Sequence, residues 1–112
     1  MQNSSFTRIT NITDENFKGF ISNENLSIVM FGATWCGPCR SIKPVFQKIA
    51  VENENISFAY CDIEDSVEFV SSLGIKAVPS FVLFQGGQVK QAKTTSRESD
   101  VRELITSAFI EQ

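Results

Sequence analysis

The chain has 112 residues, 42% of them apolar, which predicts a single domain over residues 1–112 with a modest core. A net charge of −3 with scattered lysines and arginines argues against nucleic acid and anionic membranes as partners, and the lack of histidine excludes imidazole catalysis and histidine-bound zinc. Three cysteines and a polar N-terminus are unlike a secreted disulfide scaffold, so we expect a reducing, cytoplasmic compartment.

The first half of the chain alternates between strand and helix patterns. Residues 6–9 predict a short strand, and Thr13 is the expected N-cap of the helix that follows. The apolar run over residues 26–31 predicts a buried strand. Apolar residues at helical spacing then predict a long helix that starts at the pair of cysteines, Cys36 and Cys39. Pro44 lies inside this helix, where it removes one backbone hydrogen bond and should produce a kink.

The second half predicts a strand, a short helix, a hairpin and a final helix. These segments are residues 56–61, 65–74, 80–84 with 89–92, and 101–109. Asp65 and Glu68 form a capping-box pattern for the short helix, and Gly74 ends it. Alternating strands and helices followed by a hairpin predict an α/β fold, with a mixed sheet covered by helices on both faces.

The most informative motif is Trp35-Cys36-Gly37-Pro38-Cys39, in which two thiols three residues apart can form a reversible disulfide. Cys36 lies where the buried strand meets the long helix, so its sulfur should face the helix N-terminus. Unpaired N–H groups and the helix dipole at that end favour the thiolate, which is the reactive form of cysteine. The motif therefore predicts a dithiol redox site with Cys36 as the nucleophile.

Other interpretations of these residues are less favoured. A zinc half-site would need Cys61 and either Asp62 or Glu64 to complete the ligand set, since histidine is absent. Cys61 ends an apolar strand and is expected to pack as a small hydrophobic residue. Trp35 could be a core aromatic residue, but its place beside the nucleophile favours a half-exposed lid over the thiols.

The sequence resembles the thioredoxin family over essentially its whole length. The matching segments are Phe31, residues 33–40, Pro44, Gly74-Ile75, residues 78–81 and residues 84–87. The motif alone would be weak evidence, but the motif with Pro44 and Val78-Pro79 at their spacings is a specific signature. The resemblance implies the thioredoxin fold, a central mixed five-stranded sheet flanked by four helices.

The same resemblance implies roles for the motif residues. Cys36 would attack a client disulfide, and Cys39 would then attack Cys36 to release the reduced client. Gly37 would allow close approach of the client backbone, and Pro38 would stiffen the start of the helix.

A second set of residues would form the client-binding surface. Pro79 would be held in the cis form, unlike most X-Pro bonds, and would expose the Val78 backbone to pair with a client segment. Trp35 would border this surface, and Thr94 and Thr95 stand where the family normally has a glycine in the groove.

The sequence departs from the family where the resolving cysteine loses its proton. Met30 replaces a buried aspartate that helps move protons at Cys39, and Tyr60 replaces a lysine that commonly accompanies it. Gly32 stands where many bacterial members have tryptophan. We expect Met30 and Tyr60 to tune the redox chemistry, because the internal base is missing.

Three functions fit these observations. The first is a general disulfide reductase or electron carrier for client proteins, a monomer that binds no cofactor or metal and is regenerated by thioredoxin reductase. The second is a dedicated redox partner of one client enzyme. The third is a thioredoxin-fold binding subunit with incidental redox activity, which the intact motif and Val78-Pro79 argue against.

Overall fold

The computed structural model describes residues 8–110 and contains a mixed sheet of five strands. In sheet order these are β1 (Ile9–Asn11), β3 (Ser57–Asp62), β2 (Leu26–Gly32), β4 (Ser80–Gln85) and β5 (Gln88–Thr94). Strands β1, β3 and β2 run parallel, whereas β4 is antiparallel to both β2 and β5. The expected mixed five-stranded sheet is therefore confirmed.

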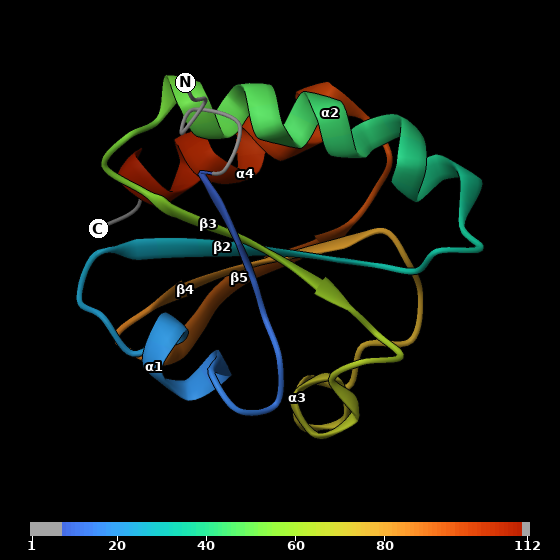
Figure 1. Ribbon diagram of the computed structural model, residues 1–112. Helices are drawn as coiled ribbons and strands as arrows, with labels where there is room; N and C mark the ends of the chain where they lie inside the picture. The colour runs from blue at the N-terminus through green and yellow to red at the C-terminus, as the bar shows by residue number, and fades with distance from the viewer. Residues whose placement is uncertain (1–7, 111–112) are drawn as a thin grey trace, which may run out of the picture.

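Four helices cover the two faces of this sheet. They are α1 (Phe17–Ile21), α2 (Gly37–Glu52), α3 (Val67–Leu73) and α4 (Glu98–Ile110). Helices α2 and α4 lie on one face and α1 and α3 on the other (Figure 1). Because β2 is the central strand, both of its faces are buried, as the apolar run in the sequence predicts.

Alternate residues of β2 point into two separate hydrophobic clusters. Ile28 and Met30 belong to a cluster with the buried residues of α2 and α4, here called the α2-face cluster. Val29 and Phe31 belong to a cluster with residues of α1 and α3, here called the α3-face cluster. This division follows the two-residue period of a strand, and it places successive side chains of β2 in different chemical surroundings.

The first helix begins later than expected, at Phe17 rather than directly after Thr13. Thr13 Oγ1 accepts a hydrogen bond from the Glu15 backbone N–H, and Asn16 Oδ1 accepts one from the Thr13 N–H. These local bonds hold residues 13–16 in a turn, because polar side chains compete with helical backbone bonding. The first strand is also displaced, to Ile9–Asn11, and residues 6 and 7 of the predicted strand lie outside the described residues.

The cap of α3 also differs from the sequence prediction. Ser66, not Asp65, is the N-cap residue, and the Ser66 side chain makes no capping bond. The Asp14 carboxylate instead accepts hydrogen bonds from the backbone N–H groups of Glu68 and Phe69, at 3.2 and 3.0 Å. A residue 54 positions away therefore caps this helix, whereas its end at Gly74, with φ of 69°, is confirmed.

Helix α2 runs from Gly37 to Glu52 through Pro44, and the Arg8 side chain, distant in the sequence, holds its C-terminal end. The Arg8 guanidinium donates to the carbonyl oxygens of Ala50, Asn53 and Ile56 at 2.8–3.1 Å. A cation at this end adds hydrogen bonds to carbonyls at and just beyond the end of the helix and complements the helix dipole.

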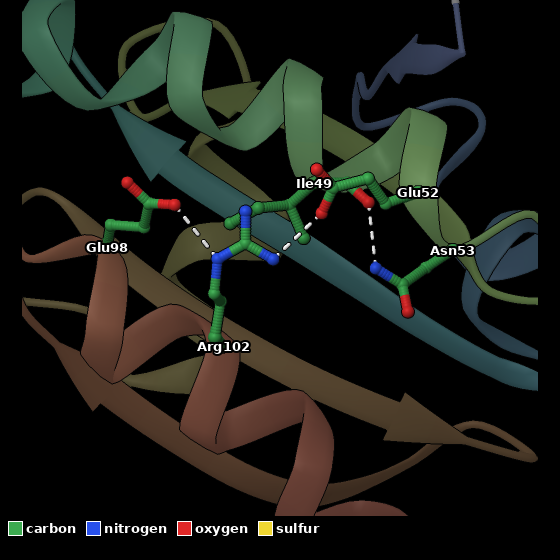
Figure 2. Close-up of polar contacts among 5 residues, drawn as sticks. All are labelled: Ile49, Glu52, Asn53, Glu98 and Arg102. Carbon is green, nitrogen blue, oxygen red and sulfur yellow. Dashed lines mark hydrogen bonds and ion pairs between the residues drawn. The ribbon is translucent and has the colours of Figure 1, made fainter.

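An ion-pair bridge joins α2 to α4 (Figure 2). Arg102 of α4 contacts Glu52 at 2.8 Å and Glu98 at 2.9 Å, and Asn53 donates to the Ile49 carbonyl beside it. The bond from Arg102 lowers the pKa of the Glu52 carboxyl. The bridge connects the C-terminal end of α2 to the first turns of α4, on the face of the sheet that the two helices share.

Candidate active site

Cys36 is the N-cap of α2, as the sequence predicts. Its backbone is extended, with φ of −94° and ψ of 108°, and its Sγ accepts a hydrogen bond from the Cys39 backbone N–H at 3.1 Å. Pro38 lies in the first helical turn, where its missing N–H leaves no bond unmade. The sulfur of Cys36 thus faces unpaired N–H groups and the positive end of the helix dipole, both of which stabilise a thiolate.

Cys36 and Cys39 form a disulfide in this structure, with their Cα atoms 5.2 Å apart. Cys36 is 5% exposed and Cys39 is 2% exposed, and both belong to the α2-face cluster. One helical turn joins the two residues, so the helix itself holds the two cysteines close enough to bond. The chemistry that this geometry supports is reversible exchange between a dithiol and a disulfide.

Trp35 precedes the nucleophile and is 63% exposed, so it is not a core residue. Its indole Nε1–H donates a hydrogen bond to Glu64 Oε2 at 2.9 Å. Glu64 follows β3, so this bond ties two loops at the end of the sheet where the disulfide lies. Sequence reasoning considered Glu64 only as a zinc ligand, because no local pattern connects residues 29 positions apart.

Four of the predicted binding residues, Val78, Pro79, Thr94 and Thr95, lie at or just before the start of β4. The Val78-Pro79 peptide bond is cis, as the resemblance implies, and Val78 packs against the cluster that contains both cysteines. The Thr95 backbone N–H donates to the Pro79 carbonyl at 3.1 Å. Thr94 pairs with Ser80 across β4 and β5, and their hydroxyl oxygens are 2.7 Å apart.

Met30 is fully buried and lies in the α2-face cluster with both cysteines. Its strand partner in β3 is Tyr60, which is partly exposed. Tyr60, Cys39 and Lys43 line a cavity of about 200 Å³, together with Ala33, Thr34 and Arg40. Burial, with help from the negative charges of Asp62 and Asp65, raises the pKa of Tyr60.

Lys43 is a site residue that the sequence analysis missed. Its Nζ lies 3.8 Å from the centroid of the Tyr60 ring, in cation–π geometry. A signal was available, because Lys43 is four residues beyond Cys39 and such residues share one face of a helix.

Cys61 lies in different surroundings from Cys36 and Cys39. It is fully buried in the α3-face cluster, on the opposite side of the sheet from Cys36 and Cys39. Within residues 8–110, no group of three or more cysteine or acidic residues has a geometry that could hold a metal ion. In the same part of the chain, no helix is both long and apolar enough to cross a membrane.

Comparisons with known proteins agree with this geometry. The thioredoxin family model matches residues 8–107. Mitochondrial thioredoxin-3 of Saccharomyces cerevisiae is 30% identical over 105 residues, which are 90% of this chain and 81% of the yeast protein.

Two solved structures show the same fold. The structure of Malassezia sympodialis thioredoxin matches with a TM-score of 0.84 and 30% identity, covering 88% of this chain and 89% of that one. A chain from a study of thiol resolution in yeast mitochondrial 1-Cys peroxiredoxin via glutathione and thioredoxin systems matches with a TM-score of 0.85, 28% identity and coverage of 93% and 99%. The Cys36–Cys39 pair makes this chain a disulfide oxidoreductase, and the chain belongs to the thioredoxin family.

Proposed function

We propose that this protein reduces disulfides of client proteins through Cys36 and Cys39. The Cys36 thiolate attacks one client sulfur, forms a mixed disulfide and releases the other client sulfur as a thiolate. Cys39 then attacks Cys36, which forms the intramolecular disulfide and releases the second client thiol. The observation that supports this order most directly is the position of Cys36 at the helix N-cap, with its sulfur bonded to the Cys39 N–H.

The client would bind across the surface formed by Trp35, Val78 and Pro79, with Thr94 and Thr95 at its border. The packing of Val78 against the cluster that contains both cysteines, and the exposed indole of Trp35, support this assignment. Gly37, at the start of α2, would let a client backbone approach Cys36 closely, and Pro38 would stiffen the start of the helix. An extended client segment would pair with the Val78 backbone in the manner of an added strand.

Regeneration of the dithiol would come from thioredoxin reductase, with this protein acting as a monomeric electron carrier in the cytoplasm. Family membership, the net charge of −3 and the scattered lysines and arginines of the sequence support a role with protein partners rather than nucleic acid. Because one relative is mitochondrial, localisation of the tagged protein in its own cells is the direct test of the compartment.

A dedicated partnership with one client is the second candidate. Two points favour it: the resemblance implies an acidic group where this chain has Met30, and one matching chain comes from work on peroxiredoxin resolution. The rate of reduction of several clients, a peroxiredoxin included, separates a general reductase from a dedicated one.

The test of the proposed function is turnover of insulin disulfides coupled to NADPH oxidation by thioredoxin reductase. We expect turnover with the wild type, none with Cys36→Ser, and stable mixed disulfides with Cys39→Ser. The role assignment is wrong if Cys39→Ser turns over normally, or if Cys36→Ser is the variant that traps clients.

A further inference from the structure

The resolving step needs a Cys39 thiolate, but no carboxylate of the described residues lines the cavity beside Cys39. Residue 30, which faces the same cluster, is an uncharged methionine. A thiol in apolar surroundings keeps its proton, because burial disfavours the charged form. Some other group must therefore favour the thiolate if the exchange proposed above is to run to completion.

Tyr60 and Cys39 meet in the space above Gly32. A Cβ atom placed on Gly32 would lie 2.8 Å from the Tyr60 hydroxyl oxygen and 3.3 Å from Cys39 Sγ. Gly32 therefore leaves room for the phenol to reach the sulfur, and any larger residue at position 32 would displace the hydroxyl. Within residues 8–110 the hydroxyl donates no hydrogen bond to a protein group, so it is available to a new acceptor.

Lys43 adds a positive charge to the same place. It lies one helical turn beyond Cys39, lines the same cavity, and holds its ammonium group over the Tyr60 ring at 3.8 Å from the centroid. The other side chains on the cavity wall from α2 and the preceding loop are Arg40, Thr34 and Ala33, so every charge on that wall is positive.

The phenol acts as a donor rather than as a base. Its pKa is raised by burial and by the nearby charges of Asp62 and Asp65, so it stays protonated at neutral pH. Strand β2 faces the cluster with Met30 and Gly32, which do not titrate. A hydrogen-bond donor and a cation beside a thiol both favour its charged form.

We propose that the Tyr60 hydroxyl and the Lys43 ammonium together stabilise the Cys39 thiolate in the resolving step. Cys39 gives its proton to water in the cavity, and the thiolate attacks Cys36 Sγ in the mixed disulfide. The Cys36–Cys39 bond forms, the bond from Cys36 to the client breaks, and the client sulfur leaves as a thiolate that takes a proton from water. Tyr60 acts by hydrogen bonding and Lys43 by charge, and neither is consumed.

The test is a stopped-flow reaction of the reduced protein with dipyridyl disulfide, an uncharged probe. Attack by Cys36 releases one thiopyridone, and attack by Cys39 on the mixed disulfide releases the second. The rate of the first phase tests the proposed function, and the rate of the second phase tests this inference. A failure of one can therefore be told from a failure of the other. Both phases are measured across pH at low and high salt.

Tyr60→Phe removes the hydroxyl and keeps the ring beneath Lys43. We expect the midpoint of the second phase to rise by about one pH unit, with a rate near neutral pH up to about tenfold lower. The first phase should not change. Lys43→Met should shift the second phase in the same direction by less, and salt should weaken the effect of this lysine in the wild type.

Two further variants keep the inference testable. Lys48→Met, on the same helix but outside the cavity, is the matched control and should leave both phases unchanged. Gly32→Ala should displace the hydroxyl and reproduce the shift of Tyr60→Phe without removing any group. An unchanged midpoint in Tyr60→Phe overturns the inference, and so does a second phase that slows equally at every pH, because that result indicates packing alone.

Discussion

Cys39 and Cys61 lie on opposite faces of the same sheet and are buried to a similar degree, at 2% and 0% exposure. The α2 face places its cysteine pair at the start of a 16-residue helix, beside a cavity with positive side chains. The α3 face places Cys61 among aromatic rings, where its thiol donates to the Asp62 carbonyl oxygen at 3.8 Å and has the Ser66 side chain as a second polar neighbour. Burial raises the pKa of Cys61 to about 11.

The comparison shows that burial alone does not decide what a cysteine does. A helix N-terminus supplies N–H donors and a positive dipole end, and Cys36 sits directly at that end because β2 leads into α2 there. The α3-face cluster offers a thiolate no helix N-terminus, and burial outweighs the one group that favours its charge, a hydrogen bond from the Ser66 side chain. The sheet thus separates a reactive pair of cysteines, Cys36 and Cys39, from the single unreactive cysteine Cys61.

The largest expected difference between the two faces is in alkylation rate. At a pKa of about 11, Cys61 is a thiolate in only about one molecule in ten thousand at pH 7. We expect iodoacetamide to modify Cys36 in the reduced protein at least about a hundredfold faster than Cys61. Mass spectrometry of quenched time points measures both rates, and similar rates would break the comparison.

Two variants, each with a carboxylate introduced on one face of the sheet, compare the two faces further. Met30→Asp and Val29→Asp each bury a polar group at a fully buried position of β2, so each should lose about 1–3 kcal/mol of stability or more. Only Met30→Asp places the carboxylate in the cluster with Cys39, where it can accept the Cys39 proton and speed the resolving step near neutral pH.

Denaturant titration measures the loss of stability in both variants, and stopped-flow exchange across pH measures the resolving step. If the two variants show identical rates and pH profiles, position 30 has no part in proton transfer and Met30 is ordinary core packing.

The raised pKa of Cys61 also predicts that the free energy of unfolding depends on pH. Its pKa is raised in the folded state, from 9.0 to about 11, so the folded protein binds more protons than the unfolded chain between these values. The stability due to the neutral thiol is complete below pH 9 and is lost as the pH rises through 11. Cys61→Ala should remove this part of the decline, and parallel stability curves for the two proteins between pH 8 and 11 would contradict the raised pKa.

Much of this fold could be predicted from the sequence, because its strongest signals are local. The apolar run of β2, the helical spacing of α2 and the Gly86-Gly87 turn each fix an element within a few residues. The Cys36 environment followed from the same junction of strand and helix.

The features that could not be predicted depend on residues far apart in the chain. Asp14 caps α3 and Glu64 binds Trp35 across 54 and 29 positions, and no periodic pattern encodes such contacts. The neighbours of Tyr60 likewise became visible only once β2, β3 and α2 were placed together.

The smallest expected effect concerns the cap of α3, on the face without the active site. The capping-box pattern assigned this role to Asp65, whereas the structure assigns it to Asp14, whose carboxylate accepts from the Glu68 and Phe69 N–H groups. Asp14→Ala should therefore cost about 1 kcal/mol, the usual value of a lost N-cap, and Asp65→Ala should cost less. Both variants should keep wild-type insulin reduction, because α3 packs on the face away from Cys36. Denaturant midpoints of the two variants decide between the assignments: a larger loss for Asp65→Ala would restore the capping box, and a loss of activity in Asp14→Ala would show that the two faces are not independent.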